Sequence, residues 1–443
     1  MTSTVEYKTV ENIQHVKYTN LYYINGEFYY FAIKNSDSID IKPIKTLGGP
    51  EHTRRIKSDK YEILPKIKYF KDETELNNYV NSLNIKELTK PTLHFSHYYD
   101  HNIAHGLYDA LYPIYLCYLR FFHEKKNESF NMFLNILIDP GGWRMPKNYV
   151  ATRDWVLNIF NDFCLGGEFM YKNNTTRNIK FNTLLVGGWH AGISFVNKKF
   201  IMPGKEISAL EKLRDRFLKA YNINPPEKTN KIKIVIINSH RYSKKEKHNL
   251  IKILIDYSKK ENIETKLVNW KDVPNFKMQL EILNNCDIHI SCSGTSMLNF
   301  PFLKDNSIHI NLGVREFWHS IPLPSLMETN ICLLSNNIYC EFYNIYKFKE
   351  VLYNETTLLL DKNINNLKNN IYLKSKQPDY INKWQKLCLE FPNDTQELIH
   401  RLNGEKEPSL IFVRFPDFII YEYIDYYKHF LNELKNRRHN FVL

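Results

Sequence analysis

The residues with the clearest capacity for chemistry lie where an apolar helix is expected to begin. His105 and Asp109 are four positions apart in the stretch HNIAHGLYDALYPIYL, and Asn102 stands at the expected start of the helix. On an α-helix this spacing places the imidazole and the carboxylate on one face, one turn apart, where the acid can orient the ring and stabilise its cation. An oriented histidine at the start of a helix is suited to act as a general base.

Other groups near this helix are alternative candidates for the base. Asp100 and His101 come directly before it, and His190 ends a later predicted strand, FNTLLVGGWH, from which it could face the same cleft. The competing interpretation is structural, because a lone histidine near a helix start is more often a cap or a solvated surface group. Both interpretations stay open at this stage.

Alternating strands and helices are expected to position these residues. The apolar stripe of the helix recurs with helical spacing at Leu107, Leu111, Ile114, Tyr115 and Leu119. Strand-like segments, PTLHFSHYY before the helix and FNMFLNILID and FNTLLVGGWH after it, indicate an α/β domain. Near the N-terminus, Asn25-Gly26 between aromatic alternating segments predicts a β-hairpin with a primed turn.

The second half of the chain has a clearer pattern. A β-branched run over 231–239 predicts a buried parallel strand, and it is followed by a helix through LIKILIDYSKK. The strand TKLVNW, the helix NFKMQLEILNN, and the strands DIHISC and SIHINLG follow in turn. This order is typical of a doubly wound parallel sheet, in which ligands bind beyond the carboxyl ends of the strands.

Two loops at such strand ends carry groups suited to bind a diphosphate. Arg241 follows the first strand, with Lys244, Lys245 and Lys247 close behind it at the start of a helix. A guanidinium can bind phosphate oxygens bidentately, and the positive end of the helix dipole adds to the attraction. The turn Ser293-Gly294-Thr295-Ser296 offers backbone amides and hydroxyls. For the lysines, a solvated turn is the competing interpretation.

Taken together, these motifs resemble glycosyltransferase family 61. The resemblance covers about residues 95–315 and rests on the order and spacing of several motifs. These are Asn102-x-x-His105-x-x-x-Asp109, then Arg241 and Asn249, Phe276-x-x-Gln279, and the loop before Asn299 and Phe302. It implies a GT-B fold, in which two Rossmann-like domains face a cleft, and an inverting, metal-independent transfer of sugar from a nucleotide-diphosphate donor, with a UDP-sugar expected. The acceptor would be a hydroxyl of a glycan, glycoprotein or glycolipid.

The resemblance also assigns roles to residues, with two departures. His105 is the candidate base and Asp109 orients it, while Asp100 and His101 are the reserve candidates, and Asn102 and His190 are further cleft residues. The donor-binding candidates are Arg241, Lys245, Asn249, Ser293, Gly294, Thr295, Ser296, Asn299 and Asn311. The family's usual His-Gly-Ala loop is replaced here by Ser293-Gly294-Thr295, and Asn311 stands where a ribose-binding glutamate is typical. No metal or other cofactor is expected, since the nucleotide sugar is a co-substrate.

The expected organisation has four parts. Residues 1–90 form an N-terminal extension with the hairpin, 91–224 an acceptor-side Rossmann-like domain, and 231–375 the nucleotide-sugar-binding Rossmann-like domain. The aromatic and basic segment 376–443 is expected to be helical and to pack back on the first domain, with contact at an anionic membrane surface as the alternative.

Composition restricts the class of protein. The chain has 443 residues, of which 43% are hydrophobic, and a net charge of +12, which favours anionic partners. Seven dispersed cysteines without a CxxC pair indicate reduced thiols. We find no apolar run with the length of a signal peptide or a membrane span, so a soluble, cytoplasmic protein is expected. Animal and plant members of the family that the chain resembles are usually membrane-anchored, so the resemblance implies an enzyme of a microbe or a large DNA virus.

Two other functions remain as alternatives. One is a binding protein that kept the glycosyltransferase fold and lost its activity, which the altered 293–296 loop favours. The other is a nucleic-acid-binding protein that uses the positive charge. No recognition helix or stacking motif supports it, so a nucleic acid is not among the expected partners.

Overall fold

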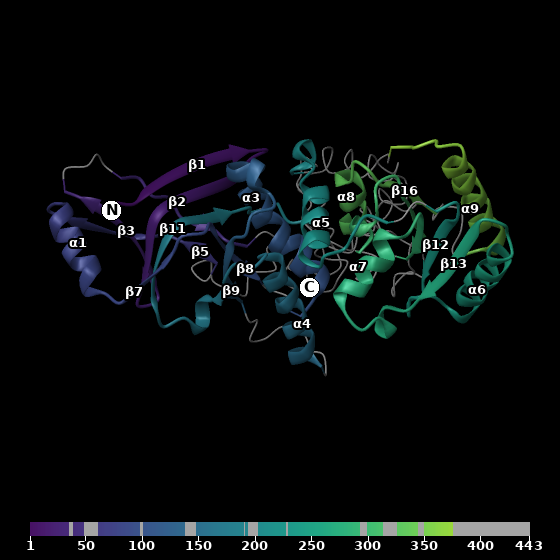
Figure 1. The fold of residues 1–443 in the computed structure, drawn as a ribbon, viewed down its shortest axis with the longest axis horizontal. Coiled ribbons are helices and arrows are strands. Elements are labelled where there is room, and N and C mark those ends of the chain that lie inside the picture. The colour runs from purple at the N-terminus through teal and green to yellow at the C-terminus, as the bar shows by residue number, and fades with distance from the viewer. Residues whose placement is uncertain are drawn as a thin grey trace, which may run out of the picture. The chain divides into compact units, whose positions relative to one another are not determined.

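A computed structural model of the chain shows two compact units (Figure 1). One unit consists of Met1–Phe195 with Lys212–Asn222, and the other of Val196–Glu211 with Ile223–Leu443. The structure describes residues 1–34, 39–47, 61–97, 101–137, 148–189, 191–193, 203–226, 229–292, 299–312, 326–343 and 350–374. The expected α/β class is confirmed, because each unit combines a sheet with helices.

In its described residues, the first unit has a nine-stranded mixed sheet. The order is β10-β9-β8-β11-β2-β3-β6, while β1 pairs with β2 and β7 pairs with β11. The strands are β1 Thr4–Val10, β2 Ile13–Ile24, β3 Glu27–Ile33, β6 Lys66–Phe70, β7 Ile85–Leu88, β8 Thr92–His97, β9 Asn131–Ile136, β10 Phe169–Tyr171 and β11 Asn178–Gly187. A separate two-stranded pair joins β4 (Ile44–Lys45) to β5 (Glu62–Ile63).

The predicted hairpin at Asn25-Gly26 is confirmed. β2 and β3 are antiparallel neighbours, and Ile24 pairs with Glu27 across the turn. Asn25 has a φ of 49° and Gly26 a φ of 88°. These left-handed conformations are the ones that a primed two-residue turn requires, and asparagine and glycine adopt them at little cost.

The N-terminal residues are part of the main sheet of the first unit. β2 pairs antiparallel with β11 from Tyr23 opposite Ile179 to His15 opposite Gly187. Strands from both sides of the boundary expected at residue 90 therefore belong to one mixed sheet. β2 covers the edge of β11 that would otherwise leave backbone groups unpaired, and β3 pairs in turn with β2.

Four α-helices and part of a fifth lie in the described residues of the first unit. They are α1 Glu73–Ser82, α2 Ile103–His105, α3 Tyr112–Phe122, α4 Tyr149–Phe163 and α5 Ala209–Ala220, of which Lys212–Ala220 belongs to this unit. α3 links β8 to its neighbour β9, and α4 links β9 to β10. The chain then returns to place β11 on the other side of β8. The strand order thus reverses between β8 and β11.

The second unit contains a parallel sheet of five described strands in the order β13-β12-β14-β15-β16. They are β12 Ile232–Ile237, β13 Ile263–Val268, β14 Ile288–Ser291, β15 Ile308–Asn311 and β16 Tyr339–Phe342. The predicted alternation of strands and helices over this part of the chain is confirmed. Here the strand order reverses between β12 and β14, as in flavodoxin-like sheets.

Helices pack on the two faces of this parallel sheet. α6 (Lys244–Ser258) and α9 (Tyr353–Lys368) lie side by side on one face, over a core that includes Ile236, Ile290 and Ile310 (Figure 1). α7 (Phe276–Asn284) and the short turn Phe300–Phe302 pack on the other. α8 spans Leu326–Leu334. None of the helices in the described ranges combines the length and apolar character that crossing a bilayer requires.

The face that packs against the Phe300 turn carries a buried histidine pair. The Nδ1 atoms of His289 and His309 lie 2.9 Å apart on neighbouring strands, and the Phe300 ring stacks on His309 at a centroid distance of 4.4 Å. Burial lowers the pKa of His289 to about 3 and that of His309 well below its usual range. Both rings are therefore neutral in the folded protein.

Acidification is expected to destabilise the fold through its buried histidines. Burial also lowers the pKa of His94 to about 3 and that of His15 to about 4. The folded protein keeps these rings neutral, whereas the unfolded chain takes up protons below about pH 6.5. The free energy of unfolding should therefore fall as the pH drops from about 6.5 to about 4, by about 1.4 kcal/mol per pH unit for each ring. Urea unfolding at a series of pH values measures this slope.

A His94→Phe variant tests whether the buried histidines cause the loss of stability at low pH. This ring lies among Phe28 and Phe133, so phenylalanine should fit the site while removing one titrating group. We expect the free energy of unfolding of this variant to depend less steeply on pH than that of the parent, by the contribution of one histidine ring. A free energy of unfolding that does not change between pH 6.5 and 4 would contradict the prediction.

Candidate functional site

The first group of candidate residues lies at the carboxyl edge of the parallel strands in the first unit. β8 ends at His97, and α2 begins a few residues later at Ile103. The backbone N–H of Ile193 donates to the Tyr108 carbonyl at 3.1 Å, so the segment that follows β11 lies against the same helical region. This edge is where the strand order reverses, which is the usual position of a ligand site in an open α/β sheet.

His105 and Asp109 are joined as their spacing predicted. Nδ1 of His105 lies 2.6 Å from Oδ2 of Asp109. The His105 side chain is 24% exposed and that of Asp109 is 8% exposed, so the ring is accessible while its carboxylate partner is buried. Since a carboxylate accepts the Nδ1 proton, the neutral ring carries its lone pair on Nε2. The pair therefore has the geometry of an oriented general base.

The helix around this pair differs from the continuous α-helix that the periodicity predicts. Gly106–Leu111 is a π-helical segment between α2 and α3. At Gly106, a Cβ atom would lie 3.1 Å from Cγ1 of Val156 and 3.2 Å from the Phe160 ring, so a side chain here would press on α4. Wide turns of this kind are rare and often occur at functional sites.

His97 is a residue of this edge that sequence reasoning missed. Its side chain is 1% exposed, and its ring lies 5.6 Å from that of Phe160. Burial lowers the pKa of His97 to about 3, and the nearby His105 and His101 add to the lowering, whereas the charge of Asp109 opposes it. The available signal was its place near the end of the predicted strand PTLHFSHYY, shortly before the helix that carries His105.

The other candidates of the first unit have different positions. Asn102 is the N-cap of α2, where its side chain accepts from the Ala104 N–H at 3.0 Å. The ring of His101 packs edge-on against that of Tyr149 at 5.4 Å. Asp100 and His190 lie outside the described residues. His101 is thus the one reserve base whose surroundings the structure describes.

In the second unit, the loop that follows β12 carries Arg241. This side chain is exposed, and its backbone N–H donates to Oγ of Ser239 at 3.2 Å. The next residue, Tyr242, is 7% exposed and belongs to the core beneath the sheet, so it anchors the loop. Arg241 therefore stands at the carboxyl edge where the order of this sheet reverses.

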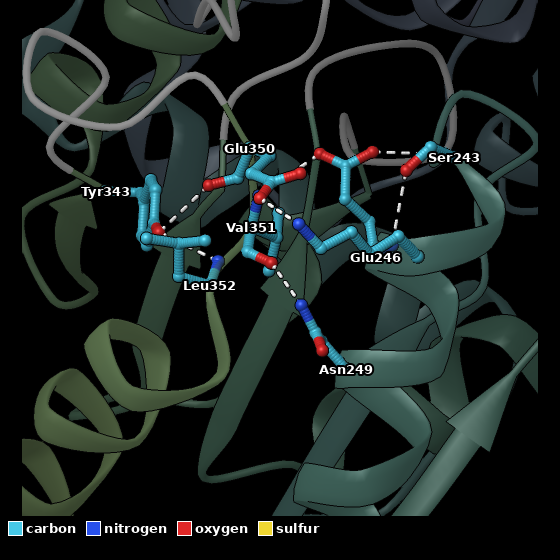
Figure 2. Close-up of polar contacts among 8 residues, drawn as sticks. Ser243, Glu246, Asn249, Tyr343, Glu350, Val351 and Leu352 are labelled. Atoms are coloured by element: carbon cyan, nitrogen blue, oxygen red, sulfur yellow. Dashed lines mark hydrogen bonds and ion pairs between the residues drawn. The ribbon is translucent and has the colours of Figure 1, made fainter.

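The N-terminus of α6 carries its own carboxylate (Figure 2). Ser243 is the N-cap and forms a capping box with Glu246, which accepts from the Ser243 N–H at 2.8 Å. The other Glu246 oxygen accepts from the Val351 N–H at 3.1 Å. Because this buried carboxylate already satisfies the helix end, the end is a weaker anion site than the basic sequence suggests.

Two predicted donor-binding residues of α6, Lys245 and Asn249, form bonds with the segment that follows Tyr343. Nζ of Lys245 lies 2.7 Å from a carboxylate oxygen of Glu350. The Asn249 amide donates to the Val351 carbonyl at 2.8 Å (Figure 2). The Tyr343 hydroxyl donates to the Glu350 carbonyl at 3.0 Å. The contacts of Lys245 and Asn249 fasten Glu350 and Val351 to α6. A direct contact of Lys245 or Asn249 with a ligand would require these bonds to exchange.

The remaining donor candidates are at the ends of neighbouring strands. Asn311 ends β15 and is 1% exposed, while Asn299 precedes the Phe300 turn and donates to the Gln279 side chain at 3.4 Å. The loop Ser293-Gly294-Thr295-Ser296 lies outside the described residues. β14, which precedes this loop, is the direct neighbour of β12, so the two predicted loops follow adjacent parallel strands.

Replacing Glu246 with alanine is expected to lower the free energy of unfolding of the second unit by about 2 kcal/mol. The change removes half of a capping box and leaves the Val351 N–H without its acceptor. Urea unfolding followed by circular dichroism measures the loss. Lys245→Ala is the matched control, because its exposed ion pair with Glu350 should contribute less than about 1 kcal/mol. Equal effects of the two variants would contradict this account.

Comparison with known proteins adds no identification. No protein-family model matches the sequence, and no curated protein matches it. Within the described ranges, no group of three or more histidine, cysteine, aspartate or glutamate side chains could hold a metal ion.

Proposed function

We propose that this protein is an inverting glycosyltransferase that moves a sugar from a nucleotide-diphosphate donor to an acceptor hydroxyl. The observation that carries the proposal is the 2.6 Å contact between His105 and Asp109 at a carboxyl edge where the strand order reverses. The proposal includes a GT-B arrangement, in which this edge and the edge with Arg241 face one cleft. The donor is a UDP-sugar, and the acceptor is a glycan, glycoprotein or glycolipid.

The first unit would supply the base. An acceptor hydroxyl has a pKa far above neutrality, so its attack on the anomeric carbon needs a group that removes the proton. Nε2 of His105 takes this proton, and Asp109 stabilises the resulting imidazolium. Attack from the face opposite to the leaving diphosphate inverts the anomeric configuration.

The second unit would stabilise the leaving group. The diphosphate gains negative charge as the glycosidic bond breaks, and preorganised donors at that position lower the barrier. Arg241 is exposed and suited to a bidentate contact, and the hydroxyls and amides of Ser293–Ser296 would complete the site. Asn249 and Lys245 support it indirectly, by fixing Glu350 and Val351 against α6.

A binding protein without transferase activity is the second candidate. It is favoured by the carboxylate of Glu246 at the N-terminus of α6, because a negative charge there opposes a phosphate. On this interpretation a nucleotide sugar would bind weakly and remain intact.

A donor screen followed by a turnover assay separates the two candidates. Thermal unfolding of the full chain with a panel of nucleoside diphosphates and their sugars identifies the donor, since a ligand of the folded state raises the unfolding temperature. Hydrolysis or transfer of that donor is then followed by proton NMR, with and without EDTA. We expect turnover to an inverted product that is insensitive to EDTA. Stabilisation without turnover would favour the binding protein, and no stabilisation by any nucleotide would refute both.

A further inference from the structure

The first unit has a groove of about 600 Å³ at the edge of the sheet opposite to His105. Asn127 and Ser129 form one wall and directly precede β9, where the parallel strands begin. The second wall comes from the end of α4 and the turn after it, and the third from the end of α5. Its volume lies in the range of sites for small ligands.

The chemistry of the lining is polar and close to neutral. The side-chain amides of Asn161 and Asn222 and the hydroxyl of Ser129 make no hydrogen bond to other described residues. The two charged groups have opposite signs and are already engaged. Nζ of Lys219 donates to the Asn127 carbonyl at 3.1 Å, and Asp162 accepts from the Tyr221 hydroxyl at 2.6 Å.

A buried arginine holds the three walls together. The guanidinium of Arg216 on α5 donates to the Phe163 carbonyl at the end of α4 and to the carbonyls of Lys126 and Glu128, at 2.8 to 2.9 Å. Its side chain is fully buried over the Phe130 ring. The walls are therefore fixed in advance, which lowers the entropic cost of binding.

The backbone of the second wall adopts conformations that few residue types allow. Leu165 has a φ of 52° and Gly166 a φ of 79°, so two successive residues are left-handed, and leucine rarely adopts this conformation. A Cβ at Gly167 would lie 1.8 Å from the Phe130 carbonyl oxygen, so only glycine fits. Strained backbone of this kind clusters at ligand sites.

We propose that this groove binds a neutral polyhydroxylated molecule, such as a short oligosaccharide. Amides and hydroxyls that both donate and accept are matched to sugar hydroxyls. The opposed charges of Lys219 and Asp162 do not favour an anion, and an aromatic ring, on which a base would stack, is absent from the described lining. The proposal does not depend on glycosyl transfer, because the groove is at the other edge of the sheet.

Saturation-transfer NMR with the full chain tests the proposal, using maltotriose and chitotriose as neutral probes and glucose 6-phosphate as a charged one. We expect saturable binding of at least one neutral probe and none of the phosphate. The double variant Asn161→Leu with Asn222→Gly removes both amides, and glycine keeps the left-handed conformation that Asn222 has, with a φ of 52°. It should weaken binding by about tenfold or more.

Asn77→Ala, which removes an exposed amide on α1, is the matched control and should leave binding unchanged. Thermal unfolding of each variant verifies that the fold is kept. Three results would overturn the proposal: no saturable binding of either neutral probe, preferred binding of glucose 6-phosphate, or binding that the double variant leaves intact. None of these readouts requires transferase activity, so failure here is distinct from failure of the proposed function.

Discussion

Replacing Arg216 with alanine is expected to lower the free energy of unfolding of the first unit by about 3–5 kcal/mol. The loss has two sources, since the change leaves a cavity beside Phe130 and Phe163 and removes the guanidinium that donates to the carbonyls of Phe163, Lys126 and Glu128. Burial lowers the pKa of Arg216 to about 10, so the guanidinium is still charged at neutral pH. Hydrogen exchange of peptides from α4 and β9, measured during urea unfolding, localises the loss.

Two variants separate the charge from the geometry. Arg216→Lys keeps the charge, but a single ammonium cannot reproduce the planar arrangement of donors, so it should recover only part of the stability. Lys219→Ala on the same helix removes an exposed donor to the Asn127 carbonyl and should cost less than about 1 kcal/mol. A free energy of unfolding of Arg216→Ala within about 1 kcal/mol of that of the parent would contradict the prediction. It would mean that the hydrogen bonds from the guanidinium to the three carbonyls contribute little to stability.

The size of this effect reflects the position of the arginine. The Phe163 carbonyl ends α4, where the helix dipole is negative, and a cation there is favourable. No carboxylate within hydrogen-bonding distance among the described residues neutralises the guanidinium, so backbone carbonyls and aromatic rings surround it instead. Nothing in the local sequence of α5 distinguishes Arg216 from the exposed Lys219 on the same helix, and only the folded structure reveals its role.

Local chemistry explains why parts of the fold could be predicted from the sequence. The strand over Ile232–Ile237 is a run of β-branched residues, and the Asn25-Gly26 turn needs only two residues to specify its conformation. The capping box of α6, Ser243-x-x-Glu246, is also a local pattern, but sequence reasoning missed it, because the basic residues beside it suggested an anion site at this helix end.

Long-range pairing explains most of what could not be predicted. The pairing of β2 with β11 joins residues about 160 positions apart, and no local pattern encodes such a partner. The π-helical segment depends on the close approach of Gly106 to α4, which lies about 50 residues later. His97 likewise became a site residue only because β8 delivers it to the helix that carries His105.

In the candidate site, too, local contacts could be predicted and long-range contacts could not. The contact of His105 with Asp109 followed from a spacing of four residues, and the structure confirms it. Lys245 and Asn249 were chosen for their chemistry, but their partners are Glu350 and Val351, about 100 residues away. A side chain's chemistry indicates what it can bind, whereas its tertiary neighbours determine whether it is available.

Replacing His105 with alanine is expected to lower the rate of sugar transfer by about 10²–10⁴-fold. The change removes the group that takes the acceptor proton. Donor binding should persist, because the residues proposed to hold the diphosphate belong to the other unit. Turnover of the donor identified by thermal unfolding measures the rate, and the shift of the unfolding temperature with that donor measures binding.

Asp109→Asn distinguishes an oriented base from a histidine that merely lies nearby. An asparagine amide that donates to Nδ1 would favour the wrong tautomer and move the proton to Nε2, so a rate loss of similar order is expected with the fold intact. His123→Ala removes an exposed histidine of the same unit and should leave the rate unchanged. If His105→Ala retained full activity, the base would have to be His101, Asp100 or His190, and Asp109→Asn would then have little effect. Because the two variants must fail together, their agreement tests the pair as a unit and not either residue alone.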